Sequence, residues 1–316
     1  MASKRVYLIT GATGFIGSCL LRELATRNEK VHLLLRKGAH LWRIRDILRE
    51  TTLHFDDLRN ADKLTKLINK IKPDIIYHLA TYGAYSSQND ADLCVRTNIE
   101  GTWNLLKATS KINYELFINT GSSSEYGFKK CPMKEDDYLE PASYYAVTKC
   151  SQTLLCAYFA KERKKPIVTL RPFSVYGPYE EGSRFIPTLL KSLYFNKKMN
   201  LVSPDITRDW IYIDDLVSAY LLIDRMKKYR GDVFNIGTGV QKSIKEVVET
   251  AADVTGESTQ FIWRGMNNRK WDTNYWVADT SKTTKLLRWS PKVSLRQGLF
   301  LTWNWLKDNL HLYPED

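Results

Sequence analysis

A tyrosine and a lysine four residues apart, in "SYYAVTKC" (143–150), form the clearest catalytic pattern in the chain. On a helix, Tyr145 and Lys149 would lie on the same face. An ammonium group near the phenol favours the tyrosinate and lowers a pKa that starts at about 10. The pair therefore predicts a general acid and base that moves a proton on or off a carbinol oxygen. Lys149 can also hold the ribose of a nicotinamide cofactor.

Two other Tyr-x-x-x-Lys pairs occur, because the pattern alone has little specificity. Tyr126–Lys130 has a glycine directly after its tyrosine and a loop-like context. Tyr194–Lys198 lies at a predicted helix end. Only Tyr145 begins a long helical pattern, downstream of a strand that ends in hydroxyl side chains.

The elements that must position these residues alternate between short apolar runs and longer helical patterns. The runs that predict strands are 5–10, 30–35, 52–55, 74–80, 115–120 and 166–171. The patterns that predict helices are 15–28, 61–71, 92–111 and 144–163. This alternation predicts an α/β fold, a doubly wound parallel (Rossmann) sheet with helices on both faces.

After residue 172 this rhythm loosens, and proline, glycine and aromatic residues become denser. Helical patterns at 214–228 and 243–256 alternate there with short extended pieces. We expect a dinucleotide-binding domain at 1–172 and a smaller substrate-binding lobe at 173–316, built over the carboxyl edge of the sheet. The two are expected to interleave, with "DWIYIDD" (209–215) and "DVFNIG" (232–237) as further strand material of the large domain.

The segment "TGATGFIG" (10–17) follows the first strand and opens the first helix. Gly11, Gly14 and Gly17 have G-x-x-G-x-x-G spacing. Such glycines let the backbone turn tightly and approach a pyrophosphate, while the helix N-terminus supplies N–H donors. The segment predicts a dinucleotide site that also includes Thr13, Phe15 and Ile16.

The end of the second strand bears on which cofactor is used. An acidic residue there would accept hydrogen bonds from the adenosine ribose of NAD. This chain has Arg36 and Lys37 instead, and a guanidinium suits a 2′-phosphate. We therefore expect NADP, with NAD as the open alternative.

Polar and apolar residues after the next two strands are also placed along a cofactor. Asp57 and Leu58 follow the third strand and are expected near the adenine. The segment "HLAT" (78–81), with Leu79, Ala80 and Thr81, follows the fourth strand. We expect His78 itself to be a packed strand residue and not a catalyst.

Charge and cysteine content limit the classes of partner. The net charge of +12 falls mostly in clusters at predicted helix ends, so we expect no nucleic-acid partner, and a doubly negative substrate explains part of the surplus. No apolar run is long enough to span a membrane, and no secretory leader is evident. Five scattered cysteines without a CxxC predict thiols in a reducing cytoplasm, and no residue cluster has metal-ligand spacing.

These motifs together resemble the extended short-chain dehydrogenases/reductases of the nucleotide-sugar epimerase/dehydratase family. The resemblance covers nearly the whole chain, through "HLAT", "TNIEGTWNLL" (97–106), "YYAVTK", "RPFSVYGP" (171–178), "RDWIYIDDL" (208–216), "FNIGTG" (234–239) and "VADTSK" (277–282). It implies a nucleoside-diphosphate sugar as substrate. It also implies a homodimer through a four-helix bundle, made by helices 92–111 and 144–163, and adds Asn98 to the cofactor contacts.

The same resemblance assigns a catalytic hydroxyl four residues before the tyrosine of a "VYG"-like turn. In "NTGSSSEYG" (119–127) that hydroxyl is Ser122. In the related dehydratases, the glutamate acid stands two residues before the tyrosine, where this chain has Ser124. Glu125 would reach that place only in a loop one residue shorter, which would make Ser123 the working hydroxyl. Otherwise Glu125 is expected to be a solvated or helix-capping carboxylate.

Substrate contacts are implied where family motifs match. Arg208 and Arg269 match diphosphate-binding arginines, and a guanidinium can hold phosphate with two hydrogen bonds. Ser174 stands where many family members have asparagine, and Ser123 is a further expected sugar contact.

From these residues we expect an NADP(H)-dependent reduction of a keto group, at C4, of a nucleotide-linked deoxysugar. Tyr145 would supply the proton, Ser122 would polarise the oxygen, and Lys149 would tune Tyr145. A 4-epimerase with tightly bound nicotinamide is the first alternative, and a 4,6-dehydratase using Glu125 is the second.

Overall fold

The structure is a computed structural model that describes residues 4–27, 29–85, 87–269 and 272–313. The chain forms two compact units, each built from several segments. The first unit comprises residues 1–127, 138–172 and 217–234, and the second comprises residues 128–137, 173–216 and 235–316.

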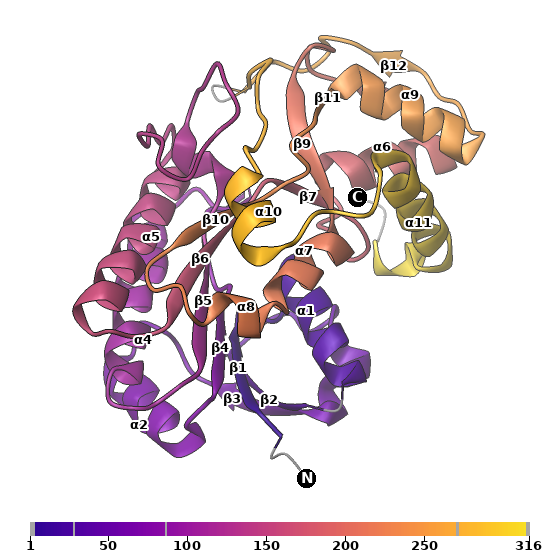
Figure 1. Cartoon of the computed structure of the whole chain (residues 1–316). Coiled ribbons are helices and arrows are strands. Elements are labelled where there is room, and N and C mark those ends of the chain that lie inside the picture. Colours follow the sequence, from indigo (N-terminus) through magenta and orange to yellow (C-terminus); the bar gives the residue numbers. More distant parts are fainter. Residues whose placement is uncertain (1–3, 28, 86, 270–271, 314–316) are drawn as a thin grey trace. The chain divides into compact units, whose positions relative to one another are not determined.

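A seven-stranded sheet forms the centre of the first unit, with strand order β10-β6-β5-β4-β1-β2-β3 (Figure 1). Neighbouring strands from β6 to β3 pair in parallel. The strands are β1 (Val6–Thr10), β2 (Lys30–Leu35), β3 (Thr51–Phe55), β4 (Ile75–His78), β5 (Leu116–Thr120), β6 (Ile167–Pro172) and β10 (Val233–Ile236). The expected doubly wound α/β fold is confirmed.

Helices cover both faces of this sheet. α2, α4 and α5 lie on one face and α1 on the other (Figure 1). Their bounds are α1 (Phe15–Thr26), α2 (Ala61–Ile71), α4 (Gly101–Thr109) and α5 (Tyr144–Glu162). On the first face, Leu64, Leu105 and Phe159 pack with Leu8 and Phe117 of the strands in one apolar core. Burial of these side chains supplies the main stabilising free energy of the unit.

The expected helix over residues 92–111 is in fact three pieces. A short α3 (Ala91–Val95) leads into a π-helical turn, η2 (Arg96–Glu100), and then into α4. Single π turns inside helices often occur at functional sites. The remaining short helices are η1 (Arg45–Glu50), η3 (Ser123–Tyr126), α7 (Ile213–Tyr220) and α8 (Ile223–Met226).

Smaller sheets and four helices make up most of the second unit. One sheet has the order β11-β9-β7 and the other pairs β12 with β8. The strands are β7 (Ser174–Tyr176), β8 (Met199–Asn200), β9 (Thr207–Tyr212), β11 (Gln241–Ser243) and β12 (Phe261–Ile262). The helices are α6 (Phe185–Tyr194), α9 (Ile244–Thr255), α10 (Ser281–Leu287) and α11 (Leu295–Asp308), followed by the short η4 (Leu310–Leu312).

The strand material expected to return to the large sheet does so only in part. β10, from "DVFNIG", is an edge strand of that sheet. β9, from "DWIYIDD", instead pairs with β7 and β11, so that expectation is wrong. Within the described ranges, no helix has the length and apolar character needed to cross a membrane.

Candidate active site

The start of α5 carries the predicted acid/base pair. Ser143 caps this helix, and its hydroxyl accepts a hydrogen bond from the Ala146 backbone N–H at 3.1 Å. Tyr145 is the second residue of the helix and is half-buried, and Lys149 follows one turn later. The cap fixes the first turn and therefore the position from which the Tyr145 side chain projects.

Lys149 is almost fully buried, with 2% of its surface exposed. Its Nζ donates to the Thr120 carbonyl at the end of β5 and to Gln152 Oε1 at 2.6 Å. Burial lowers the pKa of Lys149 to about 8, and the nearby Glu125 carboxylate opposes that fall. The pKa of Lys149 is thus close to neutral pH. The ammonium lies beside the end of β5, two residues before Ser122.

Ser122 begins η3, the short 3₁₀ helix that follows β5. Its Oγ accepts a hydrogen bond from the Ser124 N–H at 3.1 Å, and its own N–H donates to Glu125 Oε1 at 2.7 Å. This reciprocal capping box fixes the backbone of the loop. The Ser122 hydroxyl retains its hydrogen for donation to another oxygen, while Ser123 is buried.

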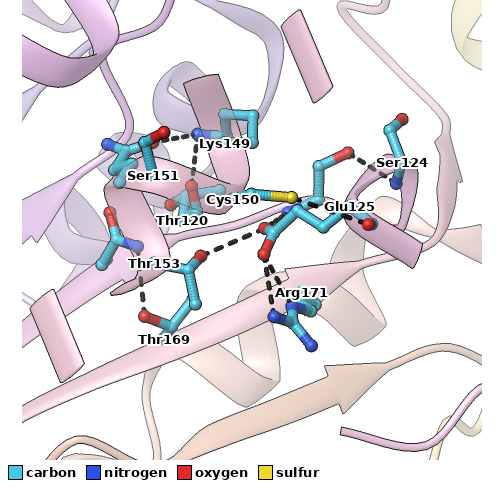
Figure 2. A network of polar contacts seen from close by, with 12 residues as sticks. Thr120, Ser124, Glu125, Lys149, Cys150, Ser151, Thr153, Thr169 and Arg171 are labelled. Carbon is cyan, nitrogen blue, oxygen red and sulfur yellow. Dashed lines mark hydrogen bonds and ion pairs between the residues drawn. The ribbon is translucent and has the colours of Figure 1, made fainter. Parts of the chain in front are cut away.

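Glu125 lies in the interior, with no exposed surface. Its carboxylate accepts hydrogen bonds from Thr153 Oγ1 at 3.1 Å and from Arg171 Nε and NH2, each at 2.9 Å. Figure 2 shows these bonds meeting at the Glu125 carboxylate. The sequence alone suggested a solvated or capping carboxylate. The capping contact is present, but the side chain is buried in an ion pair.

The glycine segment (10–17) forms a tight turn, the glycine cradle, in which side chains at Gly11 and Gly17 would clash with backbone atoms. A Cβ on Gly17 would lie 2.2 Å from the Gly11 carbonyl oxygen, and one on Gly11 would lie 2.6 Å from the Ala80 nitrogen. Gly11 also has a φ of 77°, in the region that favours glycine. Gly14 is the N-cap residue of α1 and has no side chain to accept hydrogen bonds from the first N–H groups of the helix. Those N–H groups can therefore donate to a ligand. This geometry fits a pyrophosphate.

Basic side chains lie beside that cradle. Arg36 directly follows β2 and is exposed. The pKa of Asp57 is lowered mainly by its ion pair with Arg59, and the charge of Arg36 adds a smaller effect in the same direction. Arg43 was missed by sequence reasoning, because it lies several residues beyond the strand end. Its side chain is buried, donates to the Thr13 carbonyl at 3.4 Å and stacks on Trp42.

The residues after β4 are held by a buried hydrogen-bond network. His78 is fully buried, with Nδ1 2.7 Å from Thr10 Oγ1 and Nε2 2.9 Å from Thr102 Oγ1. Thr102 donates its own hydrogen to the Asn98 carbonyl, so His78 must donate from Nε2 and accept at Nδ1. Burial lowers the pKa of His78 to about 3, so this ring is a neutral packing residue.

Asn98, in η2, uses its side-chain amide within the protein. The amide accepts from the Tyr82 N–H and donates to the Tyr82 carbonyl, both at 2.8 Å, and donates to Thr148 Oγ1 at 2.9 Å. It also accepts from Thr81 Oγ1 at 3.2 Å. Asn98 thus ties the segment after β4 to α5, and this contact with α5 could not be predicted from the local sequence.

In the second unit, Asp272 links the two predicted phosphate-binding arginines. Arg208 NH2 donates to Asp272 Oδ1 at 2.8 Å, and the Arg269 backbone N–H donates to Oδ2 at 2.8 Å. The Arg208 guanidinium lies 5.4 Å from the centroid of the Trp276 ring. Arg269 is exposed, and Ser174 is half-buried at the start of β7. Asp272 thus holds the Arg208 guanidinium next to the Arg269 backbone. Burial lowers the pKa of Arg208, and the Arg269 charge is near enough to add a smaller effect in the same direction.

The order of these elements, with the glycine cradle after β1 and the Tyr–Lys pair on α5, matches a known family. Residues 7–237 match the model of the NAD dependent epimerase/dehydratase family. The chain belongs to this family. The predicted membership is confirmed, and the protein is an enzyme of the nucleotide-sugar epimerase/dehydratase class.

Relatives of known activity cover nearly the whole chain. A UDP-glucuronate 4-epimerase of Thermodesulfobacterium geofontis is 29% identical and is aligned over 97% of both chains. A human dTDP-D-glucose 4,6-dehydratase is 27% identical over 98% of this chain and 91% of its own. The solved UDP-glucuronic acid 4-epimerase of Bacillus cereus, in complex with UDP-glucuronic acid and NAD, is 31% identical. It has a TM-score of 0.86 and covers 96% of this chain and 99% of its own.

Proposed function

We propose that the protein is a nucleotide-sugar 4-epimerase that oxidises C4 of a UDP-linked hexose or hexuronic acid and returns the hydride to the other face. The observation that carries this proposal is the Tyr145–Lys149 pair at the start of α5, with Lys149 bonded to Thr120, two residues before Ser122. The similar epimerase from Bacillus cereus, with UDP-glucuronic acid and NAD, supports the choice of substrate class. This replaces the expected net reduction as the leading function.

The residues of the glycine cradle fit a dinucleotide. Gly11 and Gly17 let the backbone pack closely at this turn, because a Cβ on either would clash with backbone atoms, and the first turn of α1 would supply N–H donors for the pyrophosphate. Once bound, a nicotinamide cofactor supplies a reversible acceptor for the C4 hydride. Lys149 would hold the nicotinamide ribose through its ammonium.

Three residues of the first unit would take part in the proton transfer. Tyr145 accepts the proton of the C4 hydroxyl as C4 loses its hydride, and it returns that proton when the hydride comes back. Ser122 donates its hydroxyl hydrogen to the sugar oxygen and steadies the charge that develops there. Lys149 stabilises the tyrosinate electrostatically.

Arginine and serine side chains of the second unit would bind the substrate. Arg208 and Arg269, both linked to Asp272, would bind the diphosphate. Burial lowers the pKa of Arg208 and Asp272 opposes this, and the guanidinium stays charged in either case. Ser123 and Ser174 remain proposed sugar contacts.

The 4,6-dehydratase alternative is disfavoured by the place of Glu125. An acid for water elimination must reach the substrate, but both Glu125 oxygens accept protein hydrogen bonds in the interior. The positions before it are Ser123 and Ser124, which cannot act as a carboxylic acid.

A 4-ketoreductase remains the second candidate, because of the basic residues near the cradle. Arg36 directly follows β2 and Arg43 donates to the Thr13 carbonyl, so these guanidinium groups could hold a 2′-phosphate, and NADPH is the usual reductant of net reductions. NAD, as in the Bacillus cereus structure, suits an epimerase.

We also propose a homodimer, through the outer face of α5 and its neighbours. Large apolar side chains are exposed there: Tyr144, Val147, Leu154 and Tyr158 on α5, and Trp103 on α4. Such a stripe at helical spacing suits helix pairing with a second copy. Leu154→Glu should give a monomer in sedimentation velocity, and a dimer of unchanged stability would contradict this interface.

We also propose a cytoplasmic location, from the state of the cysteines. All five cysteines are present as thiols, and Cys94, Cys150 and Cys156 are buried. Thiols that persist without pairing are typical of a reducing compartment. Fractionation of cells that express the protein tests this.

The proposed function is tested with purified protein, UDP-glucuronate or UDP-glucose, and no added reductant. We expect conversion to the 4-epimer and a nicotinamide that remains bound after desalting. Tyr145→Phe should stop turnover but keep the bound cofactor, while Tyr138→Phe, at a strongly exposed tyrosine of the same unit, should be unaffected. Consumption of added NADPH with a 4-keto-6-deoxy nucleotide sugar, without epimerisation, would favour the reductase instead.

A further inference from the structure

The buried carboxylate of Glu125 joins three elements that carry the proposed catalytic residues. Its Oε1 accepts the Ser122 backbone N–H at 2.7 Å from the loop and the Thr153 hydroxyl at 3.1 Å from α5. Its Oε2 accepts two N–H donors of Arg171 on β6, each at 2.9 Å. The loop, the helix and the strand therefore meet at one charged side chain.

The Glu125 backbone adds a further link to α5. Cys150 Sγ lies 3.6 Å from the Glu125 carbonyl oxygen, and Cys150 is the residue directly after Lys149 (Figure 2). Gly121 is required beside this group, because a Cβ there would lie 2.6 Å from Glu125 Oε1. The glycine before Ser122 is thus explained by the room that the Glu125 carboxylate needs.

The four donors around Glu125 indicate that it is ionised. Three of them, the two Arg171 N–H groups and the Ser122 N–H, can only donate, and they point hydrogens at both carboxyl oxygens, which favours the carboxylate form. Burial raises the pKa of Glu125 and the Arg171 guanidinium opposes that rise. An Arg–carboxylate pair with this geometry keeps its charge.

That charge lies beside the part of α5 that carries Lys149, because Thr153, which bonds to Glu125 Oε1, is one helical turn after Lys149, and Cys150, which contacts the Glu125 carbonyl, directly follows it. Burial lowers the pKa of Lys149 and Glu125 has the largest opposing effect. Other titratable groups that interact with Lys149 electrostatically include the thiols of Cys94 on α3 and Cys156 on α5 and the imidazole of His78 on β4, and Tyr145 lies one turn before Lys149 on α5. Both thiols are buried and His78 is neutral, so Glu125 is the full negative charge in this group.

We propose that Glu125 is a positioning residue of the active site, which anchors the Ser122 loop to α5 and β6 and provides a buried countercharge for Lys149. This inference rests on the proposed roles of Ser122 and Lys149. It gives Glu125 a function other than the direct acid chemistry of a dehydratase. Because Glu125 has no exposed surface, it is expected to act through Ser122 and Lys149 and not by contact with a ligand.

The test separates charge from geometry with three variants. Glu125→Gln removes the charge, Glu125→Asp keeps the charge but shortens the reach, and Thr153→Val removes one hydrogen bond and leaves the carboxylate. The pKa of Lys149 is measured by NMR on protein labelled with ¹³Cε-lysine, with the Lys149 signal assigned by its loss in Lys149→Arg. Turnover is measured with UDP-glucuronate across the same pH range.

We expect Lys149 to titrate at a pH of about 8 in the wild type and in Thr153→Val. In Glu125→Gln the midpoint should fall by about one pH unit, and the alkaline limb of kcat should move down with it. In Glu125→Asp the midpoint should stay in place, while kcat falls by about tenfold or more at little change in KM.

An unchanged Lys149 midpoint in folded Glu125→Gln would overturn the countercharge role. Wild-type kcat in Glu125→Asp would overturn the positioning role, and this variant decides the matter if Glu125→Gln does not fold. The NMR titration needs no substrate. If it gives the expected shift and no UDP-sugar is converted, the proposed function fails while the effect of Glu125 on Lys149 stands.

Discussion

Replacing Arg171 with methionine should destabilise the protein more than a typical buried substitution. Arg171 is 2% exposed and donates twice to Glu125, which has no exposed surface. Methionine fills similar volume but leaves the Glu125 carboxylate charged and without its main partner. Breaking a buried ion pair in this way costs about 3–5 kcal/mol.

The cost can be expressed as a change in melting temperature. With about 2.1 cal/mol/K of unfolding entropy per residue over 316 residues, a loss of about 3–5 kcal/mol lowers Tm by about 5–8 °C. The free energy of unfolding is measured by urea denaturation, followed by circular dichroism, with the wild type in parallel.

A double variant, Glu125→Leu with Arg171→Met, serves as the matched control. It removes the stranded charge and should be more stable than Arg171→Met alone by about 1–2 kcal/mol, although the Ser122 N–H loses its acceptor. The reasoning is refuted if Arg171→Met lies within about 1 kcal/mol of the wild type, or if the double variant is the less stable of the two.

Three further predictions concern the cofactor cradle and the acid stability. Gly17→Ala should weaken nicotinamide binding by about tenfold or more, measured by calorimetry, because its Cβ would lie 2.2 Å from the Gly11 oxygen. Gly14→Ala, with its Cβ at 3.3 Å, should have a smaller effect, and equal affinities would contradict the cradle. Arg43→Met should weaken NADPH binding more than NADH binding if a 2′-phosphate is held there, whereas equal losses would exclude that contact. Burial lowers the pKa of His32 to about 4 from 6.5, so its contribution to stability is present above pH 6.5 and is lost as the pH falls through about 4. His32→Leu should therefore lose less unfolding free energy than the wild type between pH 7 and 4, by at most about 3 kcal/mol, and identical slopes in urea denaturation would contradict this.

The central sheet was predictable because its strands are uniformly apolar and alternate with helical patterns. The Tyr145–Lys149 pair was predictable for a similar reason, since four-residue spacing at the start of a helix fixes a shared face. The glycine segment needs only the strand before it and the helix after it. In each of these cases the decisive interactions lie within a few residues along the chain.

The parts that were not predicted depend on contacts distant in sequence. Glu125 reads as a solvated or capping carboxylate until Arg171, 46 residues later, is placed against it. The π turn at η2 surrounds Asn98, whose amide bonds to Thr148, 50 residues away. Arg43 lies beyond the strand end where a cofactor contact is expected, and only the fold brings it to the Thr13 carbonyl. No local pattern reveals such pairs.

Reversible hydride transfer at C4 is tested most directly with UDP-glucuronate carrying deuterium at C4. We expect a 4-epimer that retains the deuterium at C4, because the same hydride is removed and returned, and no net consumption of NADPH. Mass spectrometry and NMR of the product locate the label. A product that has lost the deuterium, or turnover that requires stoichiometric NADPH, would contradict epimerisation by this enzyme.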